Sequence, residues 1–228
     1  MGNGERTYRI RRAMARPGLD GDWDSEVWSH ADTAHINLFR PEGSNHHPDT
    51  RVKVLYDDEG LYLIFRVYDQ FVRCLATEYQ GRVYEDACVE FFVQPRREAG
   101  YFNFEMNCGG VLLLKYIEDA RRTDAGFEKF VNVPSELGAE VVAFHSLNAP
   151  IEEEIADPVE WRVEYAIPFS LFEHYVGPLG DIPGQTWRGN FYKCADCSSH
   201  PHWASWAPIG RELNFHVPAH FAQLRFEG

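Results

Sequence analysis

The chain has 228 residues, of which 44% are hydrophobic and 25% are charged, and its formal net charge is −13. This length and composition are typical of one soluble globular domain with a single core. The acidic balance, with no basic stripe, argues against nucleic acid as a partner and against an anionic membrane surface. No run of about 18 apolar residues occurs, so no membrane-spanning helix is expected.

Residues 1–18, MGNGERTYRIRRAMARPG, are interpreted as an N-terminal arm whose arginines lie in solvent. The segment lacks the apolar stretch of a signal peptide, so we expect a cytoplasmic protein unless a leader has been removed. The five cysteines are an odd number, and three of them lie in apolar text that resembles strands. Buried free thiols are therefore expected instead of a disulfide framework.

Two features precede the middle of the chain. Residues 19–32, LDGDWDSEVWSHAD, indicate a turn and a short helix that bring Trp23 and Trp28 inward. Residues 51–69, RVKVLYDDEGLYLIFRVYD, alternate between apolar and polar positions around an acidic turn that contains Gly60, which predicts a hairpin. Asp69 ends the second strand of this hairpin at the rim of the sheet.

The most informative stretch is 84–110, YEDACVEFFVQPRREAGYFNFEMNCGG, which predicts two strands joined by a polar turn with Pro95 and Gly100. Because side chains alternate across a strand, each strand has one apolar row and one mixed row. The apolar rows are Val89, Phe91 and Val93, and Phe102, Phe104 and Met106; the mixed rows are Cys88, Glu90, Phe92 and Gln94, and Tyr101, Asn103, Glu105 and Asn107. Carboxylates, amides and aromatic rings on one sheet face are typical of a site for a hydroxyl-rich ligand or a cation.

The second half predicts more short strands, at 111–116, 130–133, 141–147, 161–167, 189–194 and 223–226, with residues 117–128 as a charged, solvated connection. Pro168 is expected to start one or two helical turns. No internal repeat or long linker divides the chain. The sequence therefore predicts one domain over 1–228, an all-β antiparallel sandwich of two sheets, jelly-roll or immunoglobulin-like, with a few short helical turns.

Seven segments in order resemble carbohydrate-binding module family 9, the modules often appended to xylanases. They run from about Leu19 to Phe226: LDGDWDSEVW, RVKVLYDDEGLYLIFRVYD, YEDACVEFF, FNFEMN, WRVEYAIPF, RGNFYKCAD, and WASW with NFHVPAHFAQLRF. The resemblance implies a non-catalytic module that binds a mono- or oligosaccharide. It also implies that the module assists the breakdown of glycans of the xylan or cellulose type.

The resemblance also implies which residues bind the sugar. One aromatic ring is expected at Tyr84, where the family usually has tryptophan, and the second at Phe215, three residues before Pro218. Sugar rings stack their C–H faces on aromatic side chains, while carboxylates and amides bind hydroxyl groups. The family's glutamate corresponds to Glu90. Its F-R-x-N strand corresponds to FEMN here, so Glu105 replaces the arginine, reversing its charge, and Asn107 matches the asparagine.

Two metal sites are considered. The family's structural calcium is expected at Asp69 and Asp196, which match acidic positions at strand ends, and no organic cofactor is implied. A zinc site is the alternative at Cys194, Cys197, His200 and His202, four ligands of suitable type within nine residues. Zinc at that loop would support a different interpretation, a metal-stabilised interaction domain without a sugar ligand.

An enzyme is the alternative function. Glu90 and Glu105 are expected on adjacent strands, and the two carboxyls of retaining glycosidases lie about 5 Å apart, those of inverting enzymes about 6.5–9.5 Å apart. The pair could therefore be the acid and base of a glycoside hydrolase. Non-catalytic binding is the preferred hypothesis, because such pairs more often bind hydroxyls or a cation.

Overall fold

The computed structural model describes residues 6–124 and 126–228, and most of its regular structure is strand. The strands are β1 (Thr7–Arg12), β2 (Thr33–Ile36), β3 (Leu38–Phe39), β4 (Asp49–Tyr56), β5 (Gly60–Asp69), β6 (Val72–Cys74), β7 (Cys88–Gln94), β8 (Tyr101–Asn107), β9 (Leu112–Thr123), β10 (Gly126–Asn132), β11 (Val142–His145), β12 (Ile151–Ile155), β13 (Val159–Pro168), β14 (Thr186–Cys194), β15 (Trp203–Ser205) and β16 (Ala222–Phe226). The helices are α1 (Glu26–Ser29), α2 (Ser135–Gly138), α3 (Phe169–Val176) and the 3₁₀ turns η1 (Val83–Glu85) and η2 (Pro218–His220). The predicted all-β class with short helical turns is confirmed.

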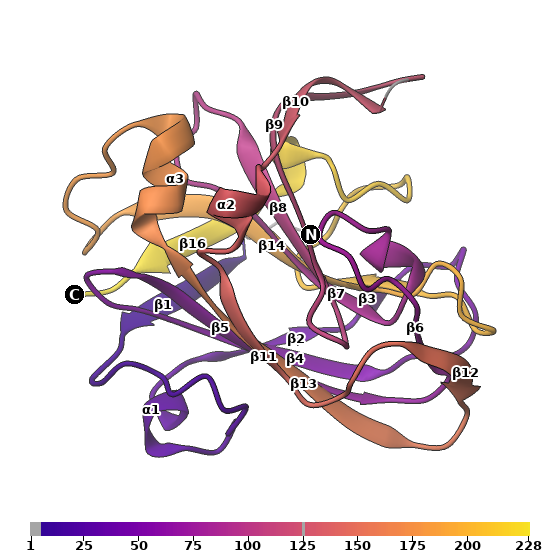
Figure 1. Ribbon diagram of the computed structural model, residues 1–228. Coiled ribbons are helices and arrows are strands. Elements are labelled where there is room, and N and C mark those ends of the chain that lie inside the picture. The colour runs from indigo at the N-terminus through magenta and orange to yellow at the C-terminus, as the bar shows by residue number, and fades with distance from the viewer. Residues whose placement is uncertain (1–5, 125) are drawn as a thin grey trace.

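Two sheets pack face to face (Figure 1). The first has the order β10-β9-β8-β7-β14-β16, and the second has the order β4-β5-β13-β11, with β2 on the other edge of β4. Apart from the pairings of β1, the neighbouring strands in both sheets are antiparallel. The small strands β12 and β6 form a separate antiparallel pair.

Strand β1 connects the two sheets and corrects two expectations. Its first part pairs with β16 and its last two residues pair with β4, in both cases parallel. Residues 7–12 are therefore part of the sandwich and not a solvated arm, and the sheets are not purely antiparallel. The reason lies in the alternation of the segment, since Tyr8 and Ile10 are buried in the core between exposed or partly exposed neighbours.

The core lies between the sheets and contains both predicted apolar rows of 84–110. Helix α3 closes one side of it, where Phe172 makes an edge-on contact with Phe102 at a centroid distance of 5.1 Å. On the outer face of the second sheet, Trp23 and Trp28 pack in a separate cluster beside α1, as predicted. Because the apolar rows of β7 and β8 face this core, the mixed rows of the same strands lie on the outer face of the first sheet.

The prediction that residues 117–128 form a solvated connection is wrong. Strand β9 continues to Thr123 and pairs antiparallel with β10, which begins at Gly126. Ile117 and Phe127 are buried in a cluster on the outer face of the first sheet, while charged neighbours such as Lys129 and Glu118 pair with each other at 2.6 Å. The high charge of the segment therefore marks a solvent-facing row of a hairpin.

No helix in the described parts of the chain is long and apolar enough to cross a bilayer.

Candidate functional site

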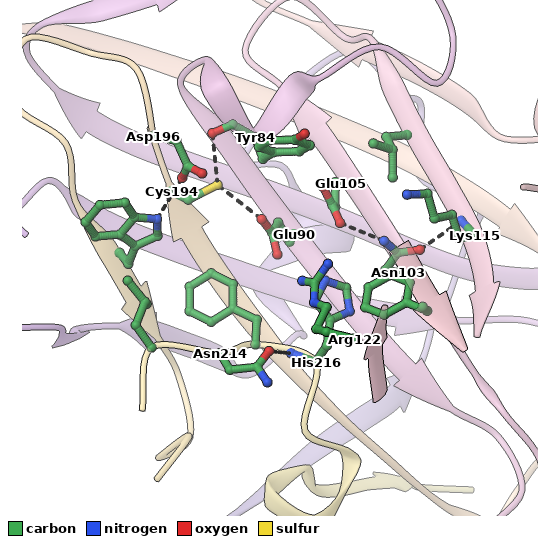
Figure 2. Close-up of a pocket in the computed structure, with 15 residues that line it drawn as sticks. Tyr84, Glu90, Asn103, Glu105, Lys115, Arg122, Cys194, Asp196, Asn214 and His216 are labelled. Carbon is green, nitrogen blue, oxygen red and sulfur yellow. Dashed lines mark hydrogen bonds between the residues drawn. The ribbon is translucent and has the colours of Figure 1, made fainter. Parts of the chain in front are cut away.

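A pocket of about 400 Å³ lies on the outer face of the first sheet (Figure 2). Its floor comes from β7, β8, β9 and β14, and its walls come from η1 and from the segments around residues 196 and 215. Its lining residues are Tyr84, Glu90, Asn103, Glu105, Leu113, Lys115, Arg122, Phe127, Cys194, Asp196, Trp203, Leu213, Asn214, Phe215 and His216. The pocket combines carboxylates, cations, amides and aromatic rings.

The sheet register explains why the polar floor residues meet. Glu90 pairs directly with Tyr192 of β14 on one side and with Glu105 of β8 on the other. Because the side chains of directly opposite residues share a face of the sheet, all three point away from the core. The mixed row seen in the sequence is therefore one continuous strip across adjacent strands.

Glu90 is the deepest carboxyl of the pocket, with 3% of its surface exposed. Its Oε1 accepts a hydrogen bond from the Cys194 thiol at 3.1 Å, whereas its buried Oε2 has no hydrogen-bond partner among the described residues. Burial, followed by the nearby Cys194 and Glu105 side chains, raises the pKa of Glu90 well above its ordinary value. Burial therefore disfavours the ionised form of Glu90, and one of its two oxygens has no hydrogen-bond partner among the described residues.

Glu105 has more polar and charged neighbours that favour its ionised form than Glu90 has. The Asn103 amide donates to Glu105 Oε1 at 2.6 Å, and Asn103 Oδ1 accepts from the backbone N–H of Lys115 at 2.8 Å. Burial raises the pKa of Glu105 to about 7, against the opposing effects of Asn103, Lys115 and Arg122. Lys115 and Arg122 of β9 thus supply positive charge near Glu105, the residue that stands where the family usually has an arginine.

Aromatic rings line opposite parts of the pocket. Phe215 stacks on Tyr192 with ring centroids 4.1 Å apart and an interplanar angle of 12°. Tyr84, on η1, lies across the floor carboxyls from the segment that carries Asn214 and His216 (Figure 2). The backbone oxygen of Tyr84 accepts a hydrogen bond from the Asp196 N–H at 3.0 Å, which joins η1 to the segment around residue 196.

Two further polar residues of the walls are held by hydrogen bonds. Trp203 Nε1 donates to Asp196 Oδ1 at 2.7 Å, and burial raises the pKa of Asp196 above its ordinary value. The His216 ring lies 2.8 Å from the Tyr101 hydroxyl through Nδ1, and burial with the nearby Arg122 and Lys115 lowers the pKa of His216 well below its usual range. Burial therefore disfavours the charged form of His216.

The structure brings together four of the five residues expected to bind a sugar, namely Tyr84, Glu90, Glu105 and Phe215. Asn107 lies outside the pocket and is fully buried. Its amide donates to the Ala76 oxygen and to Asp86 Oδ2, both at 3.0 Å, and its own oxygen accepts from the Val111 N–H. The expected contact of Asn107 with a ligand is therefore corrected, because the segment before η1 covers this end of β8.

The surroundings of Asp69 do not fit calcium. This buried carboxylate accepts from His46 Nε2 at 2.7 Å, Trp161 Nε1 at 3.0 Å and the Gln70 N–H at 2.9 Å, and Lys193 Nζ lies 3.6 Å away. Calcium takes six to eight oxygen ligands, and here the partners are N–H groups. Although burial raises the pKa of Asp69, Lys193 and His46 outweigh it and hold the pKa well below the ordinary value. Asp196, the other expected calcium ligand, lines the pocket instead.

The four residues expected to hold zinc do not converge. Cys197 is exposed, whereas Cys194 is buried beside Glu90. His202 Nδ1 bonds to the His200 oxygen and its Nε2 lies 2.9 Å from Lys193 Nζ, and burial with that ammonium lowers the pKa of His202 to about 3. His200 stacks on Phe71 at a centroid distance of 3.7 Å. In the described ranges, no group of metal-ligating side chains contains Cys197, His200 or His202.

Several residues that line the pocket were not predicted as ligand-binding residues from the sequence, chiefly Asn103, Lys115, Arg122, Asn214 and His216. The sequence contains an indication for two of them. Asn103 belongs to the mixed row already noted, and Lys115 is a lone cation in the apolar text VLLLKYI, where a charge needs a reason. Arg122 lies in the segment misread as a loop. Asn214 and His216 come from an irregular segment whose path no periodicity reveals.

Solved structures similar to this chain share its sandwich. A candidate carbohydrate-binding protein from Bacteroides uniformis has a TM-score of 0.83 and 30% identity, with 98% of this chain and all of that chain covered. A carbohydrate binding module of family 9 from Caldicellulosiruptor kristjanssonii, in complex with cellotriose, has a TM-score of 0.64, 16% identity and coverage of 98% and 94%. A structure of such a module from the same organism with glucose has a TM-score of 0.60, 15% identity and 96% coverage of each chain.

A search of curated proteins found no match. The family model described as carbohydrate-binding family 9 matches residues 27–226, which is most of the chain. This match and the 30% identity to the Bacteroides protein over nearly full length confirm the resemblance stated from the sequence. The chain belongs to carbohydrate-binding family 9.

Proposed function

We propose that this protein binds carbohydrate non-covalently in the pocket over β7, β8, β9 and β14. The observation that carries the proposal is a polar floor, with the paired carboxyls of Glu90 and Glu105, in a pocket edged by the rings of Tyr84 and Phe215. Carboxyl and amide groups bind hydroxyls, and aromatic rings pack against C–H faces. A sugar presents both kinds of surface.

The aromatic and polar parts of the pocket suit the two kinds of surface on a sugar. The C–H faces of a pyranose ring pack against Tyr84 and Phe215, and its hydroxyl edge points to Glu90 and Glu105. A carboxyl that keeps its proton both donates and accepts, and burial favours that form of Glu90; Glu105, with a pKa of about 7, accepts more strongly as it ionises. These contacts require no bond to be made or broken.

The ligand class is glucose or short glucose- and xylose-based oligosaccharides. Support comes from the relatives from Caldicellulosiruptor kristjanssonii, which are in complex with cellotriose and with glucose. The pocket volume of about 400 Å³ suits one or two sugar rings. A protein of this kind would assist the degradation of xylan or cellulose by raising the local concentration of an enzyme at its glycan.

Calorimetric titration with glucose, xylose, cellotriose and xylotriose tests the proposal. Wild type should bind at least one of them. The Tyr84→Ala variant should bind it about 3- to 10-fold more weakly, because one aromatic face is lost. Tyr68→Ala is the control, since Tyr68 is an exposed ring of β5 that does not line this pocket. A wild type that binds none of the four sugars, or equal affinity for Tyr84→Ala, would refute it.

A second candidate function, glycoside hydrolysis, has one observation in its favour. Glu90 and Glu105 are direct cross-strand partners, and burial raises the pKa of both carboxyls. A retaining enzyme needs two carboxyls at close spacing, one as the acid and one as the nucleophile. Turnover of chromogenic glycosides distinguishes this candidate from simple binding.

A further inference from the structure

Two thiols and a carboxyl meet beneath the pocket floor. Cys88 and Cys194 are direct partners on the paired strands β7 and β14, and Glu90 lies two residues beyond Cys88 on the same face. The two sulfur atoms and one Glu90 carboxyl oxygen all lie within 4.8 Å of one another, and all three side chains are buried. Within residues 6–124 and 126–228, no other three cysteine, histidine or acidic side chains come this close.

The hydrogen bonds in this cluster leave coordination capacity unused. Cys194 Sγ donates to Glu90 Oε1 at 3.1 Å and lies 3.7 Å from the Tyr84 oxygen, and Cys88 Sγ lies 3.6 Å from the Val89 oxygen. Both cysteines are free thiols. Glu90 Oε2, the unpartnered atom described above, is an independent sign that the cluster lacks a ligand, because Glu90 is 97% buried and Oε2 itself is out of contact with solvent.

The charge of the ligand set suits a divalent ion. Metal binding releases the protons of its ligands, and the charges of two thiolates and a carboxylate would neutralise the ion. A further acidic residue, Asp196, lines the same pocket as Glu90 and Cys194.

We propose that Cys88, Cys194 and Glu90 bind a thiophilic divalent cation of the zinc class. Two thiolates and a carboxylate are suitable ligands for such an ion, and three protein ligands leave a fourth tetrahedral position. Cys194 and Glu90 also line the pocket. The site differs from the zinc set expected from the sequence, with which it shares only Cys194, and it does not depend on sugar binding.

Cadmium titration of the whole chain tests this site without any sugar present. Cadmium resembles zinc in its ligands and gives an ultraviolet sulfur-to-metal absorption band when thiolates bind it. Wild type should take up one ion per chain with this band, and zinc should displace the cadmium. The Cys88→Ala and Cys194→Ala variants should lose the band, and Glu90→Gln should weaken cadmium binding by about tenfold or more.

The matched control is Cys108→Ala, because Cys108 is equally buried and next to another thiol, Cys74, outside the cluster. This variant and Cys197→Ala should keep the band. Loss of the band in Cys108→Ala with retention in Cys88→Ala would overturn the proposal. If an alanine variant fails to fold, X-ray absorption of the zinc-loaded wild type decides the question. Two sulfur ligands that persist in Cys108→Ala support the site, and none or one refutes it.

Discussion

Glu90 and Glu105 face each other on adjacent strands, and burial raises the pKa of both carboxyls. The two differ in their partners. Glu105 accepts from the Asn103 amide and lies near Lys115 and Arg122, whereas Glu90 has a thiol donor and an unpartnered oxygen. The pair therefore stabilises the folded protein best while it keeps its protons.

This pair predicts that stability falls as pH rises. For Glu105 the folded pKa is about 7, above the ordinary value of 4.5, so the folded state holds a proton that the unfolded state releases between these pH values. The resulting stabilisation is complete below about pH 4.5 and is lost as pH rises through about 7. Glu105→Gln should remove about 3 kcal/mol of this pH dependence.

Urea unfolding at a series of pH values measures the effect. Glu128→Gln, on an exposed position of β10, is the control and should keep the wild-type slope between about pH 4.5 and 7. A Glu105→Gln protein with the same slope as wild type would show that Glu105 ionises freely in the folded state.

The mixed row on β7 and β8 is where sequence interpretation succeeds, for a physical reason. Alternation along a strand is local information, so the outward placement of Glu90 and Glu105 follows from the text CVEFFVQ and YFNFEMN alone. Local information does not show which end of that row remains accessible to a ligand. Residues 75–87 fold back over Asn107 and leave Asn103 in the pocket, and only long-range packing decides this.

Asn107 should affect sugar binding without touching the sugar. Its amide bonds to Ala76 and Asp86, and Asp86 also accepts from two backbone N–H groups of the segment that leads to η1 and Tyr84. Asn107→Ala leaves these buried groups with fewer partners, which should cost about 1–3 kcal/mol of stability. Sugar affinity should fall as well, because Tyr84 loses its fixed position.

Chemical unfolding and calorimetry of the same variant separate these two effects. The control is Asn132→Ala, an exposed asparagine at the end of β10, for which neither quantity should change appreciably. If Asn107→Ala is destabilised but binds sugar like wild type, the position of Tyr84 does not depend on this hydrogen-bond network.

A buried ion pair stabilises the region on the other side of β14. Lys193 is 0% exposed, and its ammonium lies 3.6 Å from Asp69, whose other oxygen accepts from His46. Removing one partner of a buried pair leaves an uncompensated charge, so Asp69→Asn should cost about 3–5 kcal/mol. Asp49→Asn breaks an exposed pair with Arg51 and should cost about 1 kcal/mol at most. Equal losses in the two variants would mean that Lys193 finds another partner.

This network also explains why the expected metal residues did not form metal sites. Asp69 is far in the sequence from Lys193 and His202, which lie near each other. Spacing within 194–202 can suggest ligands, but it cannot reveal that Lys193 Nζ lies 2.9 Å from His202 Nε2. Likewise, Cys88 and Cys194 lie opposite each other only because of the register between β7 and β14. The sequence alone therefore could not predict the proposed metal site at Cys88, Cys194 and Glu90.

The last prediction concerns catalysis. We expect no hydrolysis of a panel of chromogenic glucosides, xylosides and cellobiosides, because the chain belongs to a family of binding modules and burial disfavours the ionised form of both carboxyls. Cross-strand placement alone provides suitable spacing for a retaining enzyme, so the spacing cannot decide the matter. Wild type and Glu90→Gln should both give rates equal to buffer. A wild-type rate above buffer that disappears in Glu90→Gln would make the protein a hydrolase, and the Tyr84→Ala titration would then report on a substrate site.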